Sequence, residues 1–133
     1  MDINVKGAIV NSSEAWIYHL FGIEATSPKM VNEAIKEANG EKLDVYINSG
    51  GGSVFAGSEI YAALRAYSGD VRIHVVGIAA SAASVIACAA RSDAAPTAQI
   101  MVHNVSSWAE GDYHEMDKTS DMLHQANRAI AAA

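Results

Sequence analysis

Short segments rich in β-branched and aromatic residues alternate with helical segments along this chain, and this alternation constrains its fold more than any other feature. Strands that alternate with helices of about a dozen residues indicate an α/β domain with a largely parallel sheet. The strand pattern is found at residues 3–6, 15–21, 43–48, 71–76 and 99–103. The helical pattern is found at residues 27–40, 54–69 and 79–90, and from about Tyr113 onward.

The first predicted helix has a clear start and stop. Ser27 is suited to be its N-cap and Pro28 its first helical residue, and Gly40 is suited to end it. Its apolar positions recur every three or four residues, which predicts one buried face. They are Val31, Ala34, Ile35 and Ala38.

The composition predicts one globular domain over residues 1–133. Of the 133 residues, 50% are hydrophobic and 18% are charged, which excludes a disordered chain. Nine Lys and Arg residues against 15 Asp and Glu residues give a net charge of −6. Because no basic cluster is present to displace counterions, we expect no nucleic-acid partner.

Other protein classes are excluded by single features. The one cysteine, Cys88, excludes a disulfide framework, and its apolar neighbours predict a buried position. The most apolar stretch, residues 71–90, contains Arg72 and His74, so we expect no membrane span. The first residues lack a signal-peptide pattern, which favours a cytoplasmic protein. His–Asp pairs near the end are typical of a solvated helix, so we expect no metal and no cofactor.

Parallel sheets place reactive groups at the carboxyl ends of their strands. Three segments of this sequence fall there: residues 50–53, residues 79–82, and His103 with Asn104. Catalytic and binding residues are therefore expected in these three segments.

The glycine run of residues 50–52 does not fit a nucleotide-binding loop. Phe55 stands where a GxGxxG motif needs its third glycine, and Ser58 stands where a P-loop needs its lysine. Two interpretations remain. The run forms a tight turn without chemistry, or it exposes backbone N–H groups to a substrate oxygen that develops negative charge.

Ser81 follows a predicted buried strand and has small residues two positions away on either side, as a nucleophile elbow requires. The pattern is AxSxA rather than GxSxG, so a plain helix cap is the alternative. Ser84 is expected to be a packed hydroxyl inside the following helix. His103 ends the next strand, where it is either a base within reach of Ser81 or a structural histidine. The other four histidines are expected to be structural or solvated.

Three segments resemble the proteolytic subunits of Clp proteases. YINSGGG at residues 46–52 resembles that family's YINSPGG block, GIAASAA at residues 77–83 its GQAASMG nucleophile segment, and IMVHN at residues 100–104 its MIHQP histidine segment. Their order and spacing agree over essentially the whole chain. The segment around Trp16 and the AASAAS run are more similar to the phage and prophage branch, which is associated with head maturation.

The resemblance implies a ClpP/crotonase-like crossover fold with a handle helix that protrudes from about residue 113. It implies a serine endopeptidase that forms an acyl-enzyme, with Ser81 as nucleophile and His103 as general base. The backbone N–H groups of Gly52 and Ala82 match the family's oxyanion hole. An extended substrate would pair with a segment on each side of the site. These segments comprise Gly52, Ser53, Val54 and Phe55 on one side, and Asn104, Val105 and Ser106 on the other.

The resemblance also implies partners. They are peptide or protein substrates, which in the phage branch are capsid, portal or scaffold proteins, and further copies of the chain in rings of about seven subunits, stacked through the handle. An ATPase partner stays open. The expected location is the cytoplasm of a bacterial host or a phage prohead.

Some residues depart from the family pattern. Gly50 replaces a proline and Ala83 replaces a glycine. The family's catalytic aspartate, which follows the handle helix, has no counterpart here, so we expect a C-terminally incomplete chain with weak activity. Two alternatives remain: an inactive, ring-forming structural relative, and a crotonase-like acyl-CoA enzyme that uses the same two backbone donors. The Ser81 and His103 motifs argue against the second alternative.

Overall fold

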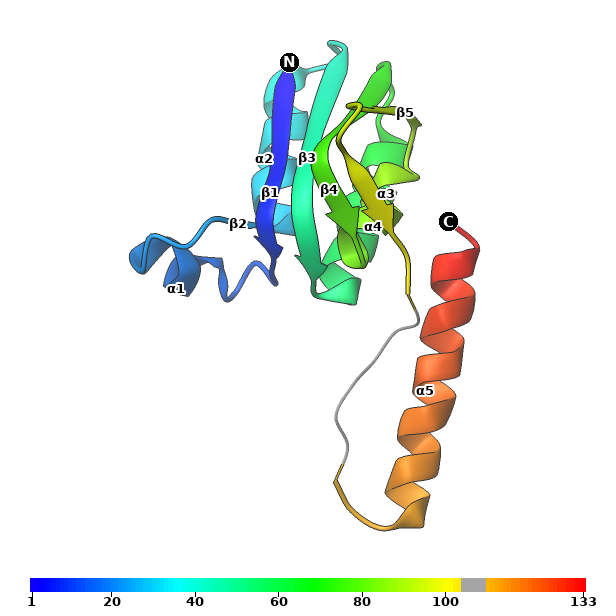
Figure 1. Cartoon of the computed structure of the whole chain (residues 1–133). Coiled ribbons are helices and arrows are strands. Elements are labelled where there is room, and N and C mark those ends of the chain that lie inside the picture. Colours follow the sequence, from blue (N-terminus) through cyan, green and yellow to red (C-terminus); the bar gives the residue numbers. More distant parts are fainter. Residues whose placement is uncertain (104–109) are drawn as a thin grey trace. The chain divides into compact units, whose positions relative to one another are not determined.

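The computed structural model describes residues 1–103 and 110–133 and confirms the predicted α/β architecture. Every strand pairing in this part of the chain is parallel, and the sheet order is β2-β1-β3-β4-β5, with β6 also paired to β4 (Figure 1). The elements are β1 (Asp2–Ile9), α1 (Ala15–Leu20), β2 (Ala25–Thr26), α2 (Pro28–Ala38), β3 (Leu43–Gly52), α3 (Val54–Ala66), β4 (Val71–Ala80), α4 (Ala82–Ala87), β5 (Arg91–Ala94), β6 (Gln99–Met101) and α5 (Tyr113–Ala131).

The chain forms two compact units, residues 1–102 and residues 103–133. The first unit contains the sheet and helices α1 to α4. The second contains α5, which begins at Tyr113 as predicted, and Asp112 caps it by accepting the N–H groups of His114 and Glu115 at 3.0 and 3.2 Å. None of the helices in the described ranges is long and apolar enough to cross a membrane.

One face of the sheet carries the hydrophobic core. Leu43, Val45 and Ile47 of β3 are fully buried, whereas the residues between them are partly exposed on the opposite face. Helices α2, α3 and α4 lie behind the sheet in Figure 1 and cover the buried face. The buried and exposed residues of β3 alternate because successive side chains of a strand point to opposite faces of the sheet.

Helix α2 begins as its sequence predicts. The Ser27 side chain accepts the N–H of Met30 at 3.4 Å, and Pro28 occupies the first helical position. The helix ends at Ala38, and Asn39 and Gly40 follow with positive φ angles of 47° and 91°. The left-handed turn therefore begins one residue before the predicted stop.

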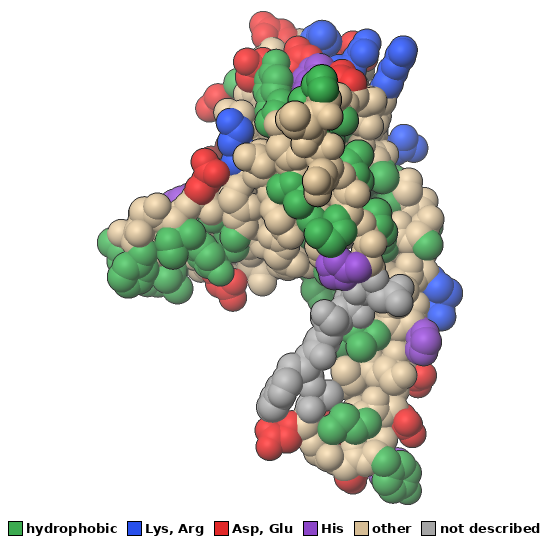
Figure 2. All heavy atoms as spheres, viewed as in Figure 1, with side chains coloured by type: hydrophobic (Ala, Val, Ile, Leu, Met, Phe, Trp, Pro, Cys, Tyr) green, Lys and Arg blue, Asp and Glu red, His purple; other side chains and the backbone are tan. Residues whose placement is uncertain are grey.

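The strand predicted at residues 15–21 is wrong, because residues 15–20 form helix α1. Only Ala15 of this helix is buried, whereas Trp16, Leu20 and the following Phe21 are 63%, 70% and 72% exposed. Figure 2 shows their side chains as part of a hydrophobic patch on the segment that extends from the sheet. Gly22, at φ 68°, ends the helix, and the N–H of Ile23 returns to the Tyr18 carbonyl at 2.8 Å.

Three further predictions are wrong. The helix predicted at residues 79–90 is shorter, because β4 extends to Ala80 and α4 ends at Ala87. Strand β5, which follows it, was not predicted. Strand β3 includes the glycine run instead of ending before it. Cys88 is exposed rather than buried, because α4 ends at Ala87 and the chain turns there.

Candidate active site

Ser81 has the strained backbone of a nucleophile elbow. It lies between β4 and α4 with φ 53° and ψ −122°, a conformation that residues other than glycine seldom adopt. Ser81 occupies the N-cap position of α4, but its side chain makes no capping hydrogen bond to the helix. The side chain is half-buried and its hydroxyl is free of any role in starting the helix.

Backbone and side-chain hydrogen bonds hold this turn on both sides. The Ser81 N–H donates to the carbonyl of Met101 in β6 at 3.0 Å. The Ser81 carbonyl accepts the N–H of Ser84 at 2.9 Å and the Ser84 hydroxyl at 2.5 Å. Ser84 is 3% exposed, which confirms that it is a packed hydroxyl. The elbow is therefore held by β6 at the N–H of Ser81 and by α4 at its carbonyl.

The glycine run of β3 lies against Ser81. Gly51 has φ 99°, and a Cβ atom there would lie 2.7 Å from the Ala80 carbonyl oxygen, 2.8 Å from Ser81 Cβ and 3.3 Å from the Ala82 nitrogen. Gly52 has φ 150°, and a Cβ atom there would collide with the Ile9 carbonyl of β1. Both glycines are thus required by close backbone approaches, and the approach at Gly51 is to the elbow itself.

Ser49, which the sequence analysis did not single out, holds this glycine segment. Its hydroxyl donates to the Gly7 carbonyl at 2.6 Å and accepts the N–H of Gly51 at 3.1 Å. Ser49 is 2% exposed. It bridges β1 and β3 where their register shifts between Lys6 and Ala8, so it holds the glycine segment that packs against Ser81.

The segment expected to contact substrate begins at the same place. Ser53 donates its N–H to Ile9 in β1 at 2.8 Å, and its side chain caps α3 by accepting the N–H of Ala56 at 3.2 Å. Val54 is partly exposed, and Phe55 is 77% exposed although it is large and apolar. An extended apolar surface is thus available beside the glycine run.

His103 is exposed and is the first residue of the second unit. It follows the end of β6 by two residues, rather than ending a strand that reaches residue 103. Met101 of β6 pairs with Ala80, the residue before Ser81. The predicted substrate residues Asn104, Val105 and Ser106 lie outside the described residues.

A second histidine, His74, lies in a charged cluster on the partly exposed face of the sheet. Its Nε2 atom is 2.9 Å from an Asp44 oxygen and its Nδ1 atom is 2.9 Å from an Asp93 oxygen. Its ring stacks on Tyr46 with centroids 5.0 Å apart. Hydrogen bonds to Asp44 and then Asp93 raise the pKa of His74, and the bond from His74 lowers the pKa of Asp44. The structural role expected for His74 fits this cluster.

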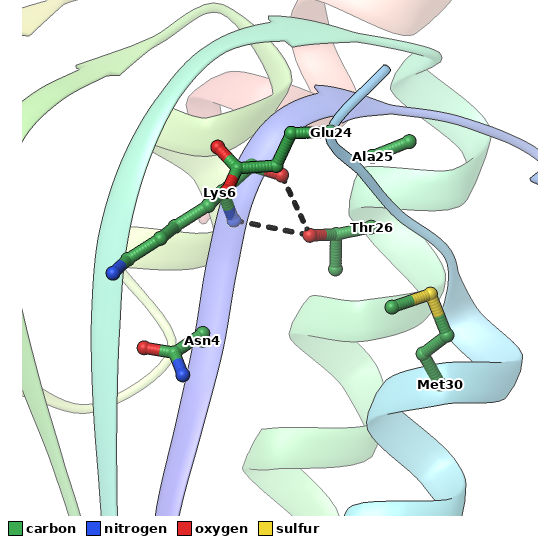
Figure 3. Close-up of a pocket in the computed structure, with 6 residues that line it drawn as sticks. All are labelled: Asn4, Lys6, Glu24, Ala25, Thr26 and Met30. Atoms are coloured by element: carbon green, nitrogen blue, oxygen red, sulfur yellow. Dashed lines mark hydrogen bonds between the residues drawn. The ribbon is translucent and has the colours of Figure 1, made fainter. Parts of the chain in front are cut away.

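Two other kinds of site were considered. Within residues 1–103 and 110–133, no group of three His, Cys, Asp or Glu side chains could hold a metal ion. A hollow of about 250 Å³ lies beside β1 and β2 (Figure 3). It is lined by Asn4, Lys6, Glu24, Ala25, Thr26 and Met30 and contains no residue of the candidate active site. The Thr26 hydroxyl accepts the Lys6 N–H at 3.0 Å and donates to the Lys6 carbonyl at 2.9 Å (Figure 3).

Known proteins resemble this chain in both sequence and fold. The ATP-dependent Clp protease proteolytic subunit of Bacteroides fragilis is 33% identical over 94 residues, which are 68% of this chain and 45% of that protein. The subunit with the same name from Ligilactobacillus salivarius is 37% identical over 89 residues, which are 65% of this chain and 45% of that protein. The chain therefore spans about half the length of these curated relatives.

A solved structure of a ClpP1 mutant from Listeria monocytogenes has a TM-score of 0.72 to this chain. The match covers 97% of this chain and 67% of that one at 19% sequence identity, which shows that the two share a fold. The sequence pattern that defines the Clp protease family matches residues 25–133. This range includes the strained serine, the glycine run beside it and His103, and the chain belongs to the Clp protease family.

Proposed function

We propose that this chain is a peptidase subunit of the Clp type, with Ser81 as its nucleophile and His103 as its general base. The observation that carries the proposal is the strained elbow at Ser81, packed directly against Gly51. Ser81 Oγ attacks the peptide carbonyl while His103 accepts its proton and returns it to the leaving amine. Water then hydrolyses the acyl-enzyme by the same route.

Chain connectivity supports His103 as the base. The Ser81 N–H is bonded to the Met101 carbonyl, and His103 follows Met101 by two residues. Two residues of chain span at most about 7 Å, which is the length of chain between Met101 and His103. An imidazole base needs to come within hydrogen-bond reach of the serine it activates.

The oxyanion donors of this proposal are the N–H groups of Gly52 and Ala82. Ala82 is the first residue of α4, where N–H groups have no partner within the helix. Gly52 adjoins Gly51, whose close approach to the Ala82 nitrogen brings the end of the glycine run next to the start of α4. Donors aimed at the developing charge commonly supply the largest part of such catalysis.

The substrate would bind as an extended strand beside Gly52 and Ser53 on one side, where Val54 and Phe55 at the start of α3 would add side-chain contacts, and along residues 104–106 on the other. The exposed Phe55 side chain supports this assignment, because it offers an apolar contact next to the proposed oxyanion donor. Backbone pairing of this kind supplies affinity, and pockets for alternate side chains supply specificity.

The finer proposal is that the chain processes capsid, portal or scaffold proteins in a bacterial host or a phage prohead, as members of the phage branch do. Its support is the resemblance of the segment around Trp16 and of the AASAAS run. Asp112 is committed to capping α5, so its carboxylate is unsuited to orient His103.

Covalent labelling tests the nucleophile. A fluorophosphonate should react at Ser81 Oγ, which forms a bond to phosphorus as fluoride leaves, and the intact mass should rise by one phosphonyl group. Ser81→Ala should not be labelled, whereas Ser58→Ala, which removes an exposed hydroxyl of α3, should be labelled like the unaltered chain.

The base is tested by two histidine variants. His103→Ala should slow labelling by at least about a hundredfold, because general-base assistance is worth ~10²–10⁴. His124→Ala, which alters an exposed histidine of α5, should leave the rate unchanged. Absence of labelling in the unaltered chain, or equal labelling of Ser81→Ala, would contradict the proposed function and favour the inactive structural relative.

A further inference from the structure

We propose that Ser84 is a positioning residue of the candidate active site, whose hydroxyl fixes the peptide plane between Ser81 and Ala82 and thereby the direction of the Ala82 N–H. The inference rests on the proposed function, in which this N–H stabilises the oxyanion. Nothing in the motifs of the sequence assigned Ser84 more than a packed position.

The contacts of Ser84 converge on one atom. Its hydroxyl lies 2.5 Å and its backbone nitrogen 2.9 Å from the Ser81 carbonyl oxygen, and the residue is 3% exposed. Serines within helices often bond to the carbonyl three or four residues earlier. Here that carbonyl belongs to a residue outside the helix with a positive φ, so the bond fixes a turn rather than duplicating a helical bond.

The Ser81 carbonyl and the Ala82 N–H belong to the same planar peptide group. Because the group is rigid, a hydroxyl that holds its oxygen also sets the direction of its N–H at the opposite side. Rotation of this plane would change the direction of the Ala82 N–H. A donor that is fixed before the reaction begins stabilises the developing charge without reorganisation.

The space beside this N–H is also maintained. Gly51 approaches closely, and a Cβ atom there would crowd the Ala82 nitrogen at 3.3 Å. The absence of a side chain at Gly51 therefore avoids crowding of the Ala82 nitrogen, while Ser84 keeps the peptide group oriented. Cys88 in turn donates its thiol to the Ser84 carbonyl at 3.3 Å, which holds Ser84 on the other side.

An isosteric pair of variants separates the hydroxyl from its volume. Ser84→Thr retains the hydroxyl and Ser84→Val replaces it with a methyl group of the same shape. We expect Ser84→Val to react with a fluorophosphonate at least about tenfold more slowly than Ser84→Thr, since loss of an entire oxyanion donor costs about 10²–10³ in rate. In hydrolysis of a small ester, Ser84→Val should lower kcat with little change in KM.

Ser27→Ala is the matched control. Ser27 is as buried as Ser84 and also uses its hydroxyl in one turn, but that turn starts α2 and does not involve Ser81. Ser27→Ala should lower the melting temperature without slowing the labelling. If the added methyl groups prevent folding, Ser84→Ala compared with the unaltered chain provides the same test without added volume.

The outcomes distinguish the two proposals. Failure of the unaltered chain to be labelled contradicts the proposed function. Normal labelling of the unaltered chain together with equal rates for Ser84→Val and Ser84→Thr, or for Ser84→Ala and the unaltered chain, overturns the role of Ser84 alone. A rate loss in Ser84→Val that Ser27→Ala does not reproduce at similar loss of stability supports the role of Ser84.

Discussion

Gly51 is the residue whose replacement should disturb Ser81 most directly. A side chain at Gly51 meets the Ala80 carbonyl and Ser81 Cβ, and its φ of 99° is unfavourable for any L residue. We expect Gly51→Ala to lower the free energy of unfolding by about 1–3 kcal/mol and to slow fluorophosphonate labelling at least about a hundredfold. Chemical denaturation and mass spectrometry measure the two effects.

Gly50→Ala is the adjacent control for this prediction. A Cβ atom at Gly50 meets nothing within 4 Å, and Gly50 is not among the residues with positive φ. Its replacement should therefore leave both stability and labelling close to those of the unaltered chain. Equal behaviour of Gly50→Ala and Gly51→Ala would show that the approach of Gly51 to Ser81 has no consequence.

His74 should make the stability of the sheet depend on pH. Both ring nitrogens can donate to Asp44 and Asp93 only when the ring is protonated, and these bonds raise its pKa. A raised pKa in the folded state means that the stabilisation is complete below the usual histidine pKa of about 6.5 and is lost as pH rises through the raised value. The lowered pKa of Asp44 keeps that carboxylate charged until the solution is more acidic than its usual pKa.

The test compares the unaltered chain with His74→Gln by urea denaturation. The variant should be destabilised most at about pH 5.5 and progressively less toward about pH 9, because only the protonated ring bridges both carboxylates. His124→Gln, at an exposed position of α5, should show no such trend. A difference between His74→Gln and the unaltered chain that does not vary with pH would exclude the protonated bridge as its cause.

At the scale of elements, the sequence predicts the interior of each strand better than its ends. Alternating apolar residues identify β3 and β4, but glycines and alanines at their ends have no preference for strands. The ends are set by neighbours far along the chain: Ile9 pairs with Gly52, and Met101 pairs with Ala80. Such pairings leave no local pattern, which is why the glycine run was expected to follow the strand.

Helix α1 shows the opposite failure, in which a local pattern misleads. Trp16, Ile17 and Tyr18 favour a strand by propensity, but propensity reflects packing on a half-buried sheet surface. Here most side chains of the segment are exposed to solvent, so local hydrogen bonds decide its conformation. Gly22, which directly follows the segment of residues 15–21, was the available signal, because glycine commonly ends helices in this way.

In the candidate site too, the sequence predicts some residues and not others. Ser81 and the glycine run are identified by motif, because the elbow and the close backbone approach demand small residues at fixed spacings. Ser49 is not identified by motif, because its hydroxyl bonds to the carbonyl of Gly7, a residue 42 positions away in the sequence. Ser84 acts only three residues away, but its importance depends on the positive φ of Ser81, which the sequence does not display.

At the scale of the whole molecule, the sheet of the unit of residues 1–102 has a face that the helices of this unit leave open. Parallel sheets are almost always covered on both faces. In the unit of residues 1–102, helices α2 to α4 cover one face, and Val76 on the other is 42% exposed among the polar residues of the His74 cluster. A surface of this kind is typical of a chain that associates with further protein.

The exposed side chains of α1 give the most specific prediction about association. Trp16, Leu20 and Phe21 are large, apolar and more than 60% exposed, and such a patch costs free energy while it remains in water. We expect the chain to self-associate, with a mass by light scattering several times its own 14.0 kDa.

A double variant, Trp16→Ser with Phe21→Ser, should shift this mass toward that of the monomer. Its melting temperature should equal that of the unaltered chain measured at a dilution at which that chain is monomeric. Val76→Thr makes the open face of the sheet more polar and tests whether that face is the contact instead. If association persists in the α1 double variant and is lost in Val76→Thr, the contact lies on the sheet. A strict monomer at high concentration would contradict association of this chain through either surface.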